Sequence, residues 1–407
     1  MEISAVVGVD CPACQATASF GPPHIMGQFW FTRCRICNYY TDEPLPPLGR
    51  KRVIYLDQFV LGNFVGGSDP FWPELRKRLV TLSQLQLIVC PYSEVHRHES
   101  LLQHDLRDVL KDLYQSLGGE IHFRFPMEIE ESQLLRSIRW FLKTGHESPN
   151  HVRVKDAFQD DPNRWAIEPT IFANMSTNSA IVEGVRAYRD SLHQGLRADF
   201  EEWHKNPRTF DEYLIEHARR HGQRLLAQYR EVAPPTFTPE GLPSTDPGIM
   251  LVHWLGCEVK ESQADSSEPL AIVARFLESD AFRQTPFVDI SSRLWAIIAE
   301  RVGKNRKTPQ NAKRSDAFDV KMISRFAPYC DAMFIDRSFH AVASDDRMKM
   351  DEDFGVKVFS YPSKGEFLDY LDEILASMSD DHREQLALVQ PQLTSVLSFL
   401  GRDKATQ

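Results

Sequence analysis

The pattern of apolar and polar positions differs between the two ends of the chain and its middle. Near the N-terminus, RVIYLDQF (52–59) and LQLIVC (85–90) are short apolar runs, which are typical of buried strands. FWPELRKRLVTLSQL (71–85) has apolar residues at helical spacing, and Pro and Ser open a second helical pattern at 91–117. EIHFRF (120–125) is a possible third strand. This part of the chain predicts alternating strands and helices.

The same alternation returns near the C-terminus. A helix is expected at about 316–327 and a strand at 332–336, followed by a strand in GVKVFSY (355–361) and a helix from 362. Between the two ends, residues 128–303 have almost entirely helical patterns, with a Pro- and Gly-rich break at 233–248. We therefore predict an α/β fold: a parallel sheet flanked by helices, interrupted by a large α-helical insertion.

The first fifty residues have a different composition and contain two CxxC pairs. Cys11 and Cys14 form the first pair, and Cys34 and Cys37 form the second. This is the spacing of a zinc ribbon, in which two knuckles supply four thiolates and leave no open coordination position. We expect a structural Zn²⁺ ion on which this small module depends for folding. The remaining cysteines, at positions 90, 257 and 330, have apolar neighbours and are expected to be buried core thiols.

Composition narrows the class of protein. The chain has 407 residues, of which 42% are hydrophobic, and its apolar runs are too short to span a bilayer. No secretory signal pattern opens the sequence, and seven cysteines that include two CxxC pairs favour a reducing compartment, so we expect a cytoplasmic protein. With a net charge of −10, nucleic-acid binding would require a local basic patch.

Acidic residues follow the predicted strands. Asp57 ends the first strand and Asp336 ends the strand at 332–336, so both are expected at the rim where parallel strands end. Asp319 lies in the first part of the helix at 316–327, with Asp316 one turn earlier. A glutamate, Glu99 or Glu94, lies on the helix after the second strand. Carboxylates at one rim can hold Mg²⁺ or Mn²⁺.

Several of these residues also have simpler explanations. Glu94 follows Ser93, a candidate N-cap, and Asp316 follows Ser315, so each could be an ordinary first-turn acid. For this reason Glu99 is preferred over Glu94 as the ligand. Asp331 could cap the preceding helix or join the site. His96 lies one turn before Glu99 and could contact the metal region or a phosphate, although a single helical histidine is more often structural.

A basic segment, KNRKTPQNAKR, directly precedes the acidic helix. Beside a carboxylate cluster, such a segment can hold a polyanion near its metal ions, but it can also be a solvated loop. Its charged residues are Lys304, Arg306, Lys307, Lys313 and Arg314.

The order of acidic residues resembles that of the PIN-domain nucleases, over roughly 52–125 and 304–375. The matching positions are Asp57 in VIYLDQF, Glu99 in SEVHRHES, Asp319 in DVKMISRFA and Asp336 in MFIDR. The resemblance implies a PIN-like fold and a Mg²⁺- or Mn²⁺-dependent endonuclease that acts on RNA rather than DNA, in a bacterial defence or toxin setting. The chain departs from compact PIN domains by its helical insertion, which lies between Glu99 and Asp319.

The division expected along the chain is a zinc ribbon, two halves of a PIN-like domain separated by the insertion, and a C-terminal helix and tail. The ribbon or the insertion could also bind a protein partner. The alternative function is a non-catalytic nucleic-acid- or protein-binding module that keeps the fold. The expected boundaries are 1–48, 49–127, 128–303, 304–380 and 381–407.

Overall fold

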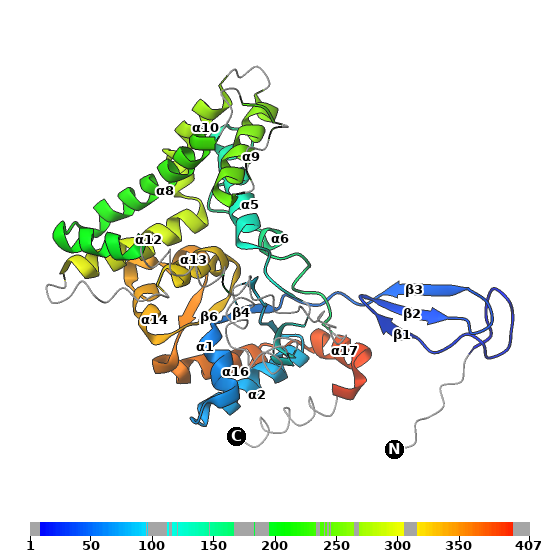
Figure 1. The fold of residues 1–407 in the computed structure, drawn as a ribbon. Helices are drawn as coiled ribbons and strands as arrows, with labels where there is room; N and C mark the ends of the chain where they lie inside the picture. Colours follow the sequence, from blue (N-terminus) through cyan, green and yellow to red (C-terminus); the bar gives the residue numbers. More distant parts are fainter. Residues whose placement is uncertain are drawn as a thin grey trace.

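The computed structural model has three parts: a small antiparallel sheet, a parallel α/β unit and a helical arm (Figure 1). The helices of the described residues include none that is long and apolar enough to cross a membrane. The residues that the structure describes are 9–94, 96, 112–113, 116–119, 121–145, 147–166, 183, 195–232, 237–239, 241, 244, 246–263, 268–304 and 316–393.

Four parallel strands form the centre of the α/β unit. They are β4 (Arg52–Leu56), β5 (Ile88–Val89), β6 (Ala332–Phe334) and β7 (Lys357–Phe359), in the order β5-β4-β6-β7. The central pair, β4 and β6, joins segments from opposite sides of the insertion, with Ile54 opposite Ala332. The predicted α/β fold with a parallel sheet flanked by helices is confirmed.

Both faces of the sheet are covered, which explains why its strands are continuous apolar runs. Along β4, Val53 and Tyr55 belong to one core and Ile54 and Leu56 to the other. The helices of this unit, with the short 3-10 turns between them, are α1 (Gln58–Gly66), α2 (Phe71–Gln84), α13 (Asp316–Phe326), η3 (Ala327–Tyr329), α14 (Arg337–Ala343), η4 (Asp346–Met348), α15 (Met350–Phe354), η5 (Tyr361–Ser363), α16 (Lys364–Ala376), α17 (Asp380–Val389) and η6 (Pro391–Leu393).

The helical arm rises from the α/β unit in Figure 1 and has its own apolar core. Its longest helix, α8 (Phe210–Val232), packs along α12 (Pro286–Lys304), which leads back toward the sheet. The other helices of the arm are α5 (Pro126–Phe141), α6 (Val154–Ala157), α9 (Pro247–Ser262), α10 (Pro269–Leu277) and α11 (Asp280–Arg283).

The antiparallel sheet has three strands, β1 (His24–Met26), β2 (Phe29–Arg33) and β3 (Tyr40–Pro44), in sequence order. It is joined to the body by Gln28, whose side-chain amide donates to the Trp165 carbonyl at 2.9 Å and accepts from the Trp165 N–H at 2.8 Å. The Trp165 indole N–H donates to the Pro46 carbonyl at 2.8 Å, so the segment after β3 is anchored as well.

One local prediction was wrong, and one helix was missed. The described part of the possible third strand, residues 121–125, adds no strand to the sheet, because His122 and Phe123 make only isolated bridges, to Tyr92 and Phe158. Helix α1 was not predicted. Its sequence, QFVLGNFVG, is apolar almost throughout and therefore lacks the helical period that identified α2.

Two histidines of α8, His217 and His221, are packed against aromatic rings. The His217 ring lies 5.6 Å from Trp203 and 6.3 Å from Trp295, and the His221 ring is stacked on Phe282 at 6.0 Å. Neither Nε2 atom has a hydrogen-bond partner. Burial lowers the pKa of His217 to about 4 and that of His221 to about 3, aided by the neighbouring arginines of α8, while Glu216 opposes the shift at His217.

We therefore predict that the protein loses stability as the pH falls below about 6.5, the usual pKa of histidine in an unfolded chain. Because both folded-state pKa values are lowered, protonation favours unfolding, and the loss continues down to about pH 4 for His217 and about pH 3 for His221, reaching an order of 1–3 kcal/mol for each. The thermal midpoint should therefore fall between pH 7 and pH 4.5, and His221→Phe should reduce that fall. His151→Gln, at an exposed histidine, is the control; the same pH response in His221→Phe and the wild type would contradict the prediction.

Candidate functional site

Four cysteines of the N-terminal module meet at one point. The Sγ atoms of Cys11 and Cys37 are 3.7 Å apart, those of Cys14 and Cys34 are 3.8 Å apart, and all four lie within 4.8 Å of one another. A disulfide would require about 2.05 Å, whereas four thiolates around an ion at about 2.3 Å are separated by about 3.8 Å. The cluster is therefore arranged to hold one metal ion.

Local backbone contacts prepare one of these thiols to carry charge. The N–H groups of Cys37 and Ile36 lie 3.4 and 3.3 Å from Cys34 Sγ. These bonds, with the Ser19 hydroxyl, lower the pKa of Cys34 to about 6. The pKa of Cys37 is instead raised to about 12: its bond with the Tyr39 backbone lowers it, but burial and the neighbouring thiols outweigh that bond. Such a cluster needs a cation before all four thiols can ionise.

A second group of candidate residues lies where the parallel strands end. Asp57 directly follows β4, and its N–H donates to the Phe334 carbonyl at the end of β6 at 3.0 Å. Asp336 lies two residues after that carbonyl. Each aspartate caps a helix: Asp57 Oδ1 accepts from the Gln58 N–H, and Asp336 Oδ1 accepts from the N–H groups of Ser338 and Phe339. The two predicted carboxylates therefore share one edge of the sheet.

Asp316 and Asp319 both lie in the first turn of α13, three residues apart and so on the same face, and both are half-buried. This helix enters β6 through η3, and Phe326 near its end stacks on Tyr55 of β4 at 5.9 Å. Because the helix of such a unit runs against the strand that it precedes, its first turn is directed toward the edge that carries Asp57 and Asp336.

The carboxylates that the structure describes do not complete a metal site by themselves. Within the described residues, the four cysteines are the one group of three or more Cys, His, Asp or Glu side chains close enough to share an ion. Glu99, the preferred glutamate, lies outside the described residues. Glu94 is helical and half-buried. Two aspartates on one edge still suit Mg²⁺ or Mn²⁺, which commonly bind one or two carboxylates together with water and substrate phosphate.

His96 supports the strand that carries Asp57. Its Nδ1 accepts from the Ser93 N–H at 3.2 Å, so Nε2 carries the proton and donates to the Leu56 carbonyl at 2.8 Å. The ring is stacked on Tyr55 at 5.3 Å, and burial lowers its pKa to about 4. Both ring nitrogens are therefore engaged inside the protein, which agrees with the structural alternative for His96 and not with a metal or phosphate contact.

Asp331 lies at the opposite edge of the sheet, where β6 begins. It accepts from Arg50 Nη2, Arg52 Nη1 and the Val53 N–H, each at 2.8 Å. These contacts tie β6 to β4. Asp331 therefore neither joins the carboxyl-edge site nor caps α13.

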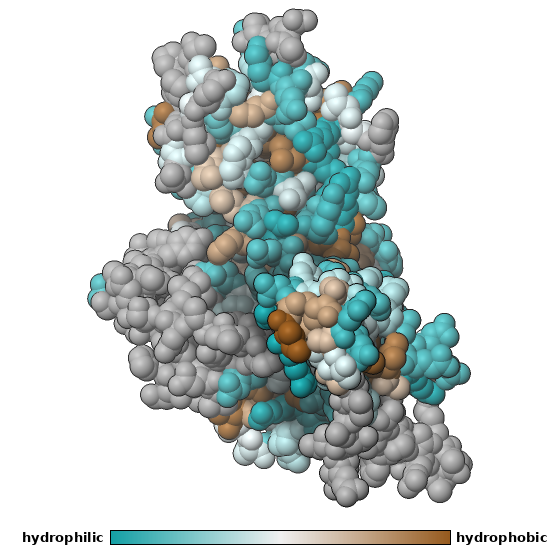
Figure 2. All heavy atoms as spheres, turned by 90° about the vertical axis from the view of Figure 1, so that its right-hand side faces the viewer, coloured by the Kyte–Doolittle hydropathy of each residue, from teal (hydrophilic) through white to brown (hydrophobic). Residues whose placement is uncertain are grey.

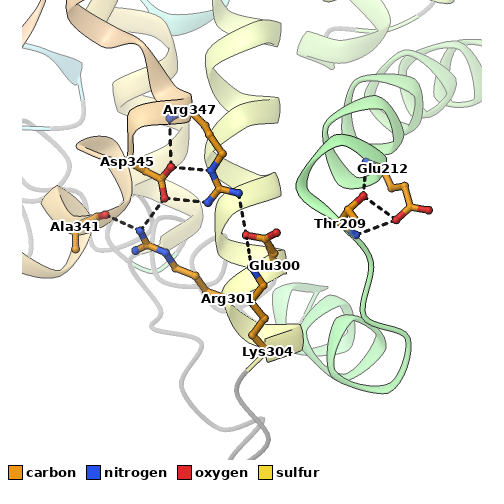
Figure 3. A network of polar contacts seen from close by, with 8 residues as sticks. All are labelled: Thr209, Glu212, Glu300, Arg301, Lys304, Ala341, Asp345 and Arg347. Carbon is orange, nitrogen blue, oxygen red and sulfur yellow. Dashed lines mark hydrogen bonds and ion pairs between the residues drawn. The ribbon is translucent and has the colours of Figure 1, made fainter.

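The basic segment is described only at its first residue. Lys304, the last residue of α12, pairs with Glu300 at 3.0 Å, and Glu300 also accepts from Arg347 at 2.8 Å (Figure 3). Arg347 forms a two-point contact with Asp345, at 2.8 and 2.9 Å, and lowers the Asp345 pKa to about 2. This network ties α12 to η4. The other basic residues, Arg306, Lys307, Lys313 and Arg314, lie outside the described residues.

One expected burial was wrong, and two residues at the carboxyl edge were not predicted from the sequence. Cys257 is only half-buried, unlike Cys90 and Cys330, so its expected place in the core was wrong. At the carboxyl edge, Tyr361 and Lys364 follow β7 directly, and their position after a predicted strand was the signal that could have identified them.

Comparisons with protein-family models, with curated proteins and with solved structures each gave no match.

The two edges of the sheet lead to opposite predictions for stability. Asp331→Ala should lower the free energy of unfolding by about 1–3 kcal/mol, because it leaves the buried Val53 N–H unsatisfied and removes a shared partner of two arginines. Asp336→Asn should change it by less than about 0.5 kcal/mol, since an amide oxygen can still accept both cap bonds. Thermal and urea unfolding of both variants measure this difference; equal losses would contradict it.

Proposed function

We propose that the protein is a Mg²⁺- or Mn²⁺-dependent endonuclease that hydrolyses phosphodiester bonds, with RNA preferred over DNA. The observation that carries the proposal is the placement of Asp57 and Asp336 after neighbouring parallel strands, at one edge of the sheet. Two segments far apart in the sequence thus bring acidic side chains to the place where α/β sheets bind ligands. The resemblance to PIN-domain nucleases supports the reaction and the preference for RNA.

In this proposal, Asp57 and Asp336 hold the catalytic cation, with Asp319, Asp316 and a glutamate, Glu99 or Glu94, as further carboxylates. A bound divalent ion would polarise the phosphodiester and lower the pKa of the attacking water. Asp336 suits this role because its three cap contacts, with Ser338 and Phe339, all go to Oδ1. His96 acts as a positioning residue, because it fixes the carbonyl of Leu56 next to Asp57.

The N-terminal module has a separate role. We propose that Cys11, Cys14, Cys34 and Cys37 hold one structural Zn²⁺ ion, as in a zinc ribbon. Figure 2 views the side of the molecule from which this module extends and shows apolar patches between hydrophilic ones. On the module, Met26, Phe29 and Tyr40 are 54%, 44% and 57% exposed. Such a surface suits contact with nucleic acid or with a protein partner. Reduced cysteines fit a cytoplasmic protein. We propose that it acts in bacterial defence or in a toxin system.

A binding module without catalysis is the second candidate. Two observations favour it. Asp57 and Asp336 each cap a helix, which is a structural role, and the described carboxylates do not form a complete ion site. Such a module would bind nucleic acid or protein without cleaving it. The two candidates differ in whether the wild-type protein cleaves the nucleic acid that it binds, and in whether the loss of one carboxylate lowers that cleavage.

For the cysteine cluster, we predict about one zinc per chain by elemental analysis, from the four-ligand count. Cys34→Ser should lose the ion and unfold the module, because so small a core depends on its metal. Cys257→Ser is the matched control and should keep the zinc, since Cys257 lies in α9. Protein purified without chelators that contains no zinc would contradict this assignment.

For the acidic edge, we predict that Asp336→Asn lowers Mn²⁺-dependent cleavage of labelled RNA by about 100-fold or more, since loss of an outer contact to a metal already costs about 10–100-fold. The matched control is Asp246→Asn. Asp246 caps α9 with the same pair of contacts, to the N–H groups two and three residues later, but lies in the helical arm. It should leave cleavage unchanged. Wild-type binding without cleavage in Mn²⁺ would favour the binding module.

A further inference from the structure

A lysine is fixed at the carboxyl edge of the sheet by three different contacts. Lys364 Nζ donates to Tyr361 Oη and to Asp69 Oδ2, both at 3.2 Å, and lies 4.5 Å from the centre of the Tyr361 ring. The Tyr361 hydroxyl donates in turn to Asp69. These contacts raise the pKa of Lys364, chiefly through the bond with Tyr361, so the ammonium group stays charged.

This cation lies at the same edge of the sheet as the proposed acidic site. Phe334 of β6 is paired with Phe359 of β7, and the Ile335 N–H donates to the Phe359 carbonyl at 2.9 Å. The two strands therefore end side by side, and Asp336 and Tyr361 each follow the end of their own strand by two residues. Lys364 opens α16 three residues later. The structure therefore sets a fixed positive charge at the edge that carries the carboxylates, after the neighbouring strand.

We infer that Lys364 contacts a backbone phosphate of the single nucleic-acid strand bound at the acidic edge, and that Tyr361 positions it. This inference rests on the proposed function. Carboxylates that hold a cation repel the phosphates on either side of the scissile one, and a lysine at the same edge offsets that repulsion. Lys364 is a substrate-binding residue here, because its charge meets a phosphate that is not the scissile one, and Tyr361 is the positioning residue.

The contact with Asp69 also fits this role. Exposed ion pairs contribute little to stability, and the side chains of Lys364 and Asp69 are 38% and 29% exposed. Asp69 therefore competes with a phosphate for the same ammonium group. Removing the lysine should weaken binding, whereas removing the charge of Asp69 should strengthen it. A purely structural pair gives no such opposite response.

The test measures binding of a labelled single-stranded RNA of about 12 nucleotides by fluorescence anisotropy, over a range of salt concentrations. Mg²⁺ and Mn²⁺ are omitted to prevent cleavage, and no chelator is added, so that the zinc stays bound. Lys364→Met should raise the Kd about 3- to 10-fold and lower the salt dependence by about one phosphate contact. Lys364→Arg should restore most of the affinity. Asp69→Asn should lower the Kd about 2- to 5-fold, and its amide oxygen can still accept from the Phe71 N–H.

The matched control is Lys357→Met. Lys357 lies over the ring of Tyr370 at 5.0 Å, but at the other end of β7, and its loss should leave the Kd unchanged. Thermal melting of each variant checks that it is folded. If wild-type protein binds RNA but Lys364→Met binds equally well, or if Asp69→Asn weakens binding, the inference is overturned and the proposed function stands. If wild type neither binds nor cleaves RNA or DNA, both are overturned.

Discussion

The pairing of β4 with β6 is the interaction on which the rest of the structure depends. It joins β4 (residues 52–56) to β6 (residues 332–334), and hence the two segments of the α/β unit that precede and follow the helical arm. Asp331 fastens the beginning of this pair, through its backbone N–H to the Val53 carbonyl and its side chain to the Val53 N–H, both at 2.8 Å. Only when the pair is formed do Asp57 and Asp336 reach the same edge.

The helical arm is tied to the sheet by buried polar contacts as well as by apolar packing. Gln133 of α5 donates to Tyr329 Oη at 3.0 Å, at the turn that leads into β6, and Arg325 of α13 pairs with Glu130 of α5. Gln133, Tyr329 and Glu130 are buried and Arg325 is nearly so, and loss of either pair would leave unsatisfied polar groups. A second connection runs from α12 through Glu300 to Arg347. The arm therefore contacts α13, the helix whose first turn carries Asp316 and Asp319.

The central strands could be predicted from the sequence because strands covered on both faces are continuous apolar runs, as RVIYL and AMF are. The position of Asp331 could not be predicted. A residue between a helix and the strand that follows lies at the edge where that strand begins, but its partners there, Arg50, Arg52 and Val53, come from the other side of the insertion. The role of His96 was left open for a related reason: its spacing along a helix does not reveal that its ring stacks on Tyr55. The cysteine cluster was predicted best, because metal-ligand spacing is local in sequence.

The proposed function requires a divalent cation at the carboxyl edge of the parallel sheet. Anomalous X-ray diffraction from crystals soaked in Mn²⁺ locates such an ion without reference to activity. We expect a peak in contact with the carboxylates of Asp57 and Asp336, separate from the signal at Cys11, Cys14, Cys34 and Cys37. A map with a peak at the cysteines and none at Asp57 and Asp336 would overturn the proposal.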